Sequence, residues 1–148
     1  MSFIDNIDRR KAEREEQLKL AQEAWRSQEI DEFRRWVESV LPDGVQIKSA
    51  YYESRYGRGH DTAGPVVQID LGGGVQFDLR LHYSWIYICL PGVLNVDYSG
   101  HLTHMLYKPL TYIGGGRNNP DAVEKTKYEL EGRLIEAYEV LLHRAQKC

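Results

Sequence analysis

The sequence predicts an α+β fold: a long N-terminal helix (or two helices), a central, mainly antiparallel sheet of about 4–6 strands, and a C-terminal helix packed on the sheet. Charge is concentrated at both ends. Residues 1–40 carry ten acids and eight bases, residues 41–119 six of each, and residues 120–148 six acids and five bases. Charged ends are typical of helices with a solvated face, whereas the middle, with eight of the ten tyrosines, is typical of strands. Because helical and strand segments are segregated, we expect an antiparallel sheet.

Length and composition narrow the possible classes of protein. The 148 residues suit a single α+β domain spanning 1–148, and a net charge of −3 disfavours duplex nucleic acid as a partner. Cys89 and Cys148 show no pairing pattern, which excludes a disulfide scaffold and a four-cysteine zinc site. Residues 1–20 lack the apolar segment of a secretory signal, and Trp85–Leu94 is too short for a bilayer span. We therefore expect a cytoplasmic protein with no membrane partner, cofactor or metal.

The N-terminal helix is predicted by strong helix formers and two apolar stripes. The stripes consist of Leu18, Ala21 and Trp25, and of Ile30, Phe33, Val37 and Val40. The second stripe is rotated by about a third of a turn from the first, so either the helix changes partner near Ser27 or two helices meet there. Residues 8–17 have no large apolar side chain, which predicts that 1–17 form a projecting or frayed helical arm.

Strands are predicted in the middle of the chain, where turn residues separate β-type runs. The expected strands are Val45–Tyr52, Pro65–Leu71, Val75–Leu81, a run from Trp85 to Leu90, Val93–Tyr98, His101–Tyr107 and Leu110–Ile113. The third strand alternates, with Leu79 on the apolar face and Asp78, Arg80 and His82 on the other. The fourth strand has no polar face, so we expect it to be covered on both sides.

The C-terminal helix is predicted to begin after Asn119, a good N-cap, with Pro120 in the first turn. Its apolar stripe consists of Val123, Leu130, Leu134, Ala137, Tyr138 and Leu141. We expect this stripe to pack on the sheet.

A candidate anion site lies in residues 112–121, YIGGGRNNPD. Glycines let backbone N–H groups approach an anion, and a helix N-terminus adds a positive partial charge. The residues predicted to bind such a ligand are Gly114, Gly115, Gly116, Arg117, Asn118 and Asn119. The alternative is a pliable connection between strand and helix.

A candidate partner-binding loop covers residues 53–64, ESRYGRGHDTAG. The residues predicted to contact a partner are Arg55, Tyr56, Arg58 and His60. Arg and Tyr are enriched in binding hot spots, and long glycine-rich loops are often functional. The alternative is a hairpin loop without a ligand.

Two His-x-Ser/Thr motifs, His82-Tyr83-Ser84 and His101-Leu102-Thr103, suggest a catalytic alternative. The pair resembles the two-histidine phosphoesterases, and this resemblance implies that His82 and His101 act as acid and base while Ser84 and Thr103 hold phosphate. His101 and His104 are three apart, so on a regular strand they would face opposite sides and bind no common metal.

The sequence therefore favours a non-enzymatic accessory protein, of the kind found among small phage or mobile-element proteins. It would act by protein–protein contact, as an inhibitor does when it covers its target, and by capturing a small anionic, phosphate-bearing ligand. We expect a protein partner and a homodimer, because residues 18–41 offer two apolar stripes. The alternatives are a phosphoesterase or nucleotide-processing enzyme using His82 and His101, and an assembly protein that oligomerises through its N-terminal helix.

Overall fold

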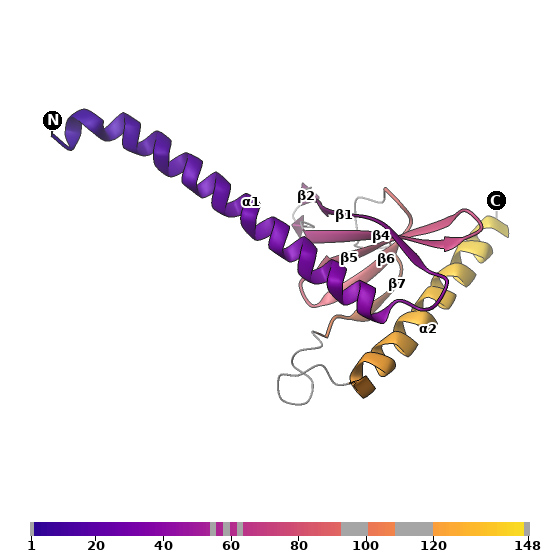
Figure 1. Cartoon of the computed structure of the whole chain (residues 1–148). Coiled ribbons are helices and arrows are strands. Elements are labelled where there is room, and N and C mark those ends of the chain that lie inside the picture. Colours follow the sequence, from indigo (N-terminus) through magenta and orange to yellow (C-terminus); the bar gives the residue numbers. More distant parts are fainter. Residues whose placement is uncertain are drawn as a thin grey trace.

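Two helices enclose one face of a five-stranded antiparallel sheet, as the sequence predicted (Figure 1). The computed structural model describes residues 2–53, 56–57, 60–61, 64–92, 101–108 and 120–146. The helices are a 3-10 turn η1 (Ile4–Asn6), α1 (Ile7–Val40) and α2 (Pro120–Gln146). The strands are β1 (Gln46–Glu53), β2 (Tyr56–Gly57), β3 (His60–Asp61), β4 (Gly64–Gly72), β5 (Val75–His82), β6 (Trp85–Cys89) and β7 (His101–Leu106).

The main sheet is a meander with the order β1-β4-β5-β6-β7, and β2 pairs with β3 in a separate two-stranded ribbon. Consecutive strands of the main sheet are thus neighbours, which short antiparallel connections allow. The β4–β5 connection shows how glycine serves this arrangement, since Gly73 and Gly74 have φ angles of 62° and 81°. Two successive positive φ values match the twist of a tight hairpin, and side chains disfavour them. The predicted strands at 93–98 and 110–113 lie outside the described residues.

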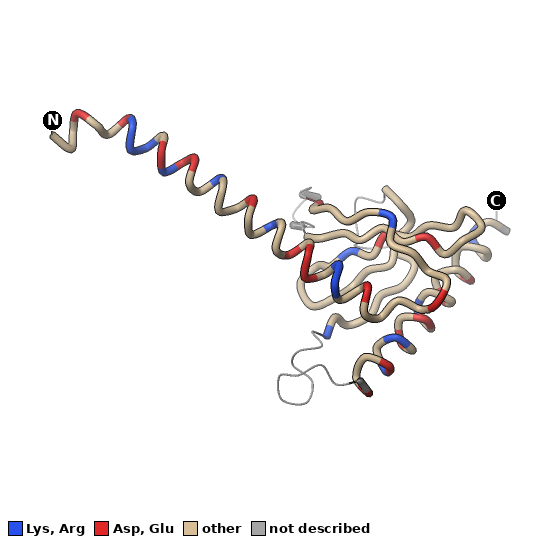
Figure 2. Tube along the Cα trace, viewed as in Figure 1, with Lys and Arg blue, Asp and Glu red and all other residues tan. Residues whose placement is uncertain are grey.

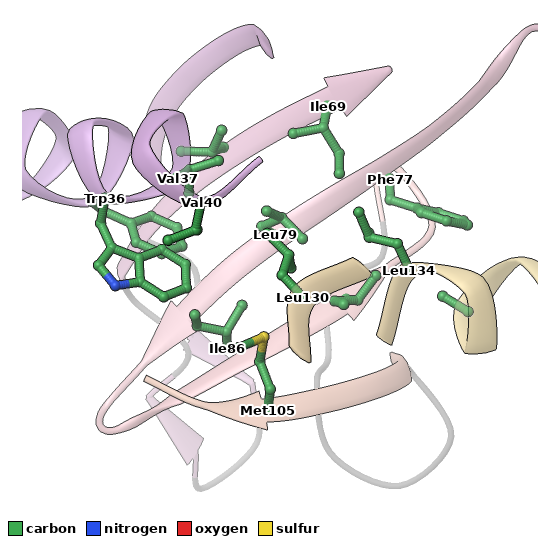
Figure 3. Close-up of a cluster of buried hydrophobic side chains, with 14 of the residues drawn as sticks. Trp36, Val37, Val40, Ile69, Phe77, Leu79, Ile86, Met105, Leu130 and Leu134 are labelled. Atoms are coloured by element: carbon green, nitrogen blue, oxygen red, sulfur yellow. The ribbon is translucent and has the colours of Figure 1, made fainter. Parts of the chain in front are cut away.

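The core lies between the sheet and the two helices, on what we call the helix face (Figure 3). The sheet supplies aliphatic side chains such as Ile69, Leu79 and Ile86, and α2 supplies Leu130 and Leu134. The C-terminal third of α1 completes this core with Phe33, Trp36, Val37 and Val40, all buried. The indole Nε1 of Trp36 donates a hydrogen bond to the backbone oxygen of Lys108, 3.0 Å away, and so ties α1 to the end of β7.

The two stripes of the N-terminal segment belong to one continuous helix, so of the two alternatives at Ser27 the structure has a single helix whose surroundings change there. The second stripe packs on the sheet, whereas residues 8–28 are exposed throughout. Figure 1 shows α1 projecting far beyond the sheet. Trp25 and Arg26 mark the point of departure, because their side chains contact the ring of Tyr52 on β1.

One prediction about an aromatic residue needs correction. Tyr138, placed in the apolar stripe that was expected to pack on the sheet, is 40% exposed. Tyrosines also contribute little to the core of the sheet, which is mainly aliphatic, and Tyr51 and Tyr83 are exposed. The phenolic hydroxyl group explains the difference, because a buried tyrosine needs a hydrogen-bond partner and an aliphatic side chain does not.

Candidate functional site

The two glycine-rich candidates are only partly within the described structure. Residues 114–119, the predicted anion loop, lie outside the described residues, as do Arg55 and Arg58 of the predicted partner-binding loop. The backbones of Tyr56 and His60 belong to β2 and β3, where Tyr56 pairs with Asp61 and Gly57 pairs with His60. Both candidates therefore remain predictions.

The four residues of the phosphoesterase alternative do not share one face of the sheet. His82 pairs with Trp85 across the β5–β6 hairpin, and Ser84 lies in the turn of that hairpin. Thr103 is buried opposite Ile88, in the cross-strand row that also contains Leu79, so its side chain faces the helices. The arrangement that the resemblance requires, with both hydroxyl groups beside the histidines, is not formed by these residues.

The two histidines are also separated along the sheet. His101 pairs with Cys89, four residues beyond Trp85 on the intervening strand β6. Regular strand dimensions then place the Cα atoms of His82 and His101 roughly 16 Å apart. Both rings contact Tyr87, at centroid distances of 6.4 Å for His82 and 5.3 Å for His101. The register thus gives each histidine Tyr87 as a neighbour.

The expectation that His101 and His104 face opposite sides is wrong, because β7 contains a bulge. Ile88 pairs with Thr103 but Cys89 pairs with His101, so Leu102 is an extra residue in the register. Such an insertion reverses the alternation of side chains beyond it. The two imidazole rings consequently lie on the same face, with centroids 5.2 Å apart. Even so, no group of three or more His, Cys, Asp or Glu side chains in the described part of the chain could hold a metal ion.

Arg80 is the most unusual side chain of the sheet face that lies away from the helices, which we call the polar face. Cross-strand pairs place it between Val66 on β4 and Tyr87 on β6, in the third strand of five. Arg80 is 3% exposed, and its Nε, Nη1 and Nη2 atoms are buried without a hydrogen-bond partner among the residues that the structure describes. Buried donors are nearly always paired in folded proteins. A guanidinium group with unused donors is therefore a candidate binding group.

The negative charges around Arg80 compensate its positive charge only in part. Glu53 Oε2 lies 3.6 Å from Arg80 Nη2, a distance that makes an ion pair but is too long for a good hydrogen bond. Asp78, two residues along β5, accepts hydrogen bonds from Gln68 Nε2 and from the backbone N–H of Gly92, each at 3.3 Å. Burial raises the pKa of Asp78 despite these hydrogen bonds and the nearby charge of Arg80. Among the described residues, Arg80 thus has one carboxylate in ion-pair range and a second nearby carboxyl group, Asp78, whose ionised form is disfavoured by burial.

Cys89 is a second buried group on the polar face, directly across from Asp78. Burial raises the pKa of its thiol to about 12, against a smaller opposing influence from Arg80. The thiol is therefore protonated at neutral pH, and a protonated buried thiol is not a nucleophile. This cysteine acts as a small apolar side chain at the floor of the polar face.

Aromatic and imidazole rings cover the part of the polar face beyond Arg80. Tyr87 lies between Arg80 and His104 in one cross-strand row. The ring of His104 contacts Trp85 and Tyr87, with centroids 5.3 Å and 6.2 Å away. Such a surface offers apolar area with hydrogen-bonding groups at its edges.

The alternation of the strand placed Arg80 on the face opposite Leu79, but Arg80 was not among the predicted site residues. The signal that could have found it was an arginine in the middle of a strand with a half-buried pattern. Lys and Arg are rarely fully buried unless paired, so the position itself was informative. The bulge that brings His101 onto the face of His104 could not be located from the sequence.

Comparisons with protein-family models, with curated proteins and with solved structures found no match to this chain. None of the helices in the described residues is long and apolar enough to cross a membrane. Function is therefore inferred from three features of the molecule: the exposed segment of α1, the buried guanidinium group of Arg80, and the outer side of α2.

Proposed function

We propose that this chain is a non-enzymatic binding protein that acts by protein–protein contact, and that residues 8–28 of α1 are the segment that docks on the partner. The observation that carries the proposal is the contrast within one helix. Every residue from 8 to 28 is exposed, while Phe33 to Val40 anchor the same helix in the core. The core thus holds a long helical segment away from the domain (Figure 1).

The energetics of an unsupported helix favour a partner. Helical segments gain most of their stability in proteins from packing of an apolar face, whereas every residue from 8 to 28 is exposed. Leu18, Leu20 and Trp25 are all exposed. Burying each large apolar side chain against a partner contributes about 1.5–3 kcal/mol.

The shape of the partner site follows from the positions of these side chains. Leu18 and Trp25 share one face of the helix, whereas Leu20 lies two residues from Leu18 and so points to nearly the opposite side. A flat surface could bury only one of these faces. We therefore expect the partner to supply a groove or a pair of helices.

Charge on the exposed segment bears on specificity. Figure 2 shows acidic and basic residues alternating along it. A mixed charge pattern disfavours nucleic acid, which selects a basic face, and is compatible with a protein groove with charged rims. We place this contact in the cytoplasm, because a free cysteine such as Cys89 suits a reducing compartment.

Site-specific photo-cross-linking in cells that make the protein tests this proposal. A photoreactive amino acid at Leu18 should give one discrete adduct with a different protein. The same amino acid at Lys19, about 100° around the helix from both Leu18 and Leu20, is the matched control and should give at least about tenfold less of that adduct, since interface cores exclude water and rims do not. Equal labelling from both positions, or no adduct from Leu18, would rule out a specific docking face on this segment.

We further propose that the protein captures a small ligand with a carboxylate or phosphate group, with Arg80 as the residue that binds it. Supporting this second function is the set of buried guanidinium donors without hydrogen bonds. Arginine presents its donors in a planar fork that fits either oxyanion. Glu53 and Asp78 lie nearby, so a singly charged carboxylate should be favoured over doubly charged phosphate.

Nuclear magnetic resonance of arginine-labelled protein tests the ligand proposal on the wild-type chain, and a variant serves only to assign the signal. Titration with benzoate should shift the Nε–Hε signal of Arg80 in a saturable way, and inorganic phosphate should shift it less. The signal of the exposed Arg34 is the internal control, and Arg80→Lys identifies the Arg80 signal. A signal unmoved at about 10 mM benzoate would exclude even a millimolar site.

A further inference from the structure

The outer side of α2 carries an exposed apolar stripe that nothing in the described structure covers. Its members are Tyr128, Ile135, Tyr138 and Leu142, which are 82%, 52%, 40% and 43% exposed. Tyr128 and Ile135 lie across the helix from Leu130, Leu134 and Ala137, the side chains with which α2 packs into the core, and Tyr138, four residues from Leu134, lies at the border of the two sides. We propose that this stripe pairs with the same stripe of a second copy of the chain, in an antiparallel two-fold contact centred on Gly132.

Gly132 is the observation that locates the centre of the contact. It is exposed in the middle of α2, and a Cβ atom added there would meet nothing within 4 Å. Glycine is unfavourable inside a helix, and packing against the described residues gives no reason for it at this position. Gly132 lies within the stripe, between Tyr128 and Ile135. A missing side chain at this point lets another helix backbone approach closely.

Charge complementarity indicates a second copy of the chain as the occupant. In a two-fold antiparallel pair, residues equally distant from the centre on either side meet across the interface. Lys125 lies seven residues before Gly132 and Glu139 seven residues after it, and both are exposed. Each Lys125 would therefore meet Glu139 of the second copy, twice in every dimer.

Tyr128 and Ile135 follow the same symmetry to within one residue. Tyr128 lies four residues before Gly132 and Ile135 three residues after it, so the ring of one copy would cover the aliphatic side chain of the other. A parallel pairing would instead set Lys125 against Lys125 and Glu139 against Glu139, which is repulsive. The self-complementary pattern thus selects the antiparallel arrangement.

A contact one helix wide is smaller than a standard protein interface, so we expect a dimer with a Kd on the order of micromolar. The dimer would carry two exposed α1 segments. If these segments dock as proposed above, two of them in one particle would raise the avidity for a partner that offers two sites. The dimer itself does not depend on that function, and its test uses the purified chain alone.

Charge reversal tests the pairing by analytical ultracentrifugation. Lys125→Glu and Glu139→Lys should each weaken the dimer at least about tenfold, because each places like charges together twice. The double variant should dimerise as the wild type does. An equimolar mixture of the two single variants should form a mixed dimer, because both of its charge pairs are then complementary.

A second variant separates the contact from general charge effects. Gly132→Leu fills the point of closest approach and should leave a folded monomer, as checked by circular dichroism. Lys19→Glu, an exposed reversal far from α2, is the matched control and should dimerise normally. A wild-type chain that is monomeric at about 100 μM, far above the expected Kd, would overturn the proposal. Single variants that dimerise like the wild type, or a double variant without recovery, would overturn it equally.

Discussion

The two faces of the sheet differ in how well the surroundings of a buried side chain compensate for its burial. Two neighbouring residues of β5 show the difference. Leu79 points to the helix face, where Val67, Ile88 and the helices enclose it. Arg80 points to the polar face, where it is nearly as buried but has Glu53 at 3.6 Å as its ionic neighbour and unused donors. Burial of Leu79 stabilises the fold, whereas burial of Arg80 costs free energy that its contacts recover only in part.

This contrast indicates which face is constrained by stability and which by function. An aliphatic residue at position 80 would give a more stable sheet, as it does at position 79. Groups that cost stability tend to be retained where binding requires them. The polar face, with its arginine and imidazole groups, is therefore the better candidate for ligand capture, and the helix face is the scaffold.

The largest expected effect is on the helix face. Leu79→Ala should lower the free energy of unfolding by about 2–5 kcal/mol, because it removes buried methyl groups and leaves a cavity. Urea denaturation followed by tryptophan fluorescence measures it. Leu81→Ala, at a partly buried position of the same strand, is the control and should cost less. A cost below that of Leu81→Ala would show that the helix face is not the tightly packed scaffold.

On the polar face we expect a substitution to raise the free energy of unfolding, whereas Leu79→Ala on the helix face lowers it. The double variant Arg80→Met, Glu53→Gln should raise the free energy of unfolding by about 1–4 kcal/mol, because it replaces a poorly satisfied buried ion pair with neutral groups. Glu53→Gln alone should be destabilising, since it leaves the guanidinium group buried without its countercharge. The same denaturation experiment measures both. A double variant less stable than wild type would mean that Arg80 is a structural element rather than a binding group.

The sequence predicts the helix face well because apolar periodicity records it. The stripe from Ile30 to Val40, the alternation of Val75–Leu81 and most of the C-terminal stripe identify the core before any coordinates. These patterns reflect burial, which depends on spacing along one chain segment. Tyr138 is misplaced because a tyrosine at helical spacing suits the core and an exposed stripe equally well.

The polar face is predicted poorly because it depends on strand register. His101 reaches the face of His104 and Tyr87 through a one-residue bulge opposite Ile88 and Cys89, and regular alternation along β7 would place it on the other face. The loose pairing of Arg80 with Glu53 joins residues on strands that are not adjacent in the sheet. Such a distance between side chains cannot be read from spacing along the chain.

The smallest expected effect is on the pH dependence of stability, and it tests the contrast between the two faces of the sheet. Burial raises the pKa of Asp78, so its proton is bound more tightly in the folded state than in the unfolded state. Its contribution to stability is therefore greatest at low pH and is lost as the pH rises through the raised pKa. Asp78→Asn removes the ionisable group, and the amide of Gln68 can turn to keep a hydrogen bond. The variant should be more stable than the wild type at neutral pH.

The advantage of Asp78→Asn should disappear as the pH falls to about 3, where both states of the wild-type carboxyl are protonated. Urea denaturation across this pH range measures it. Asp70→Asn is the matched control on the same strand pair and should have the opposite sign at neutral pH, because Asp70 accepts a 2.7 Å hydrogen bond from Gly72 and pairs with Lys48. An Asp78→Asn variant less stable than wild type at neutral pH would show that the ionised carboxylate is well satisfied, which would remove one of the two reasons for treating the polar face as under-satisfied.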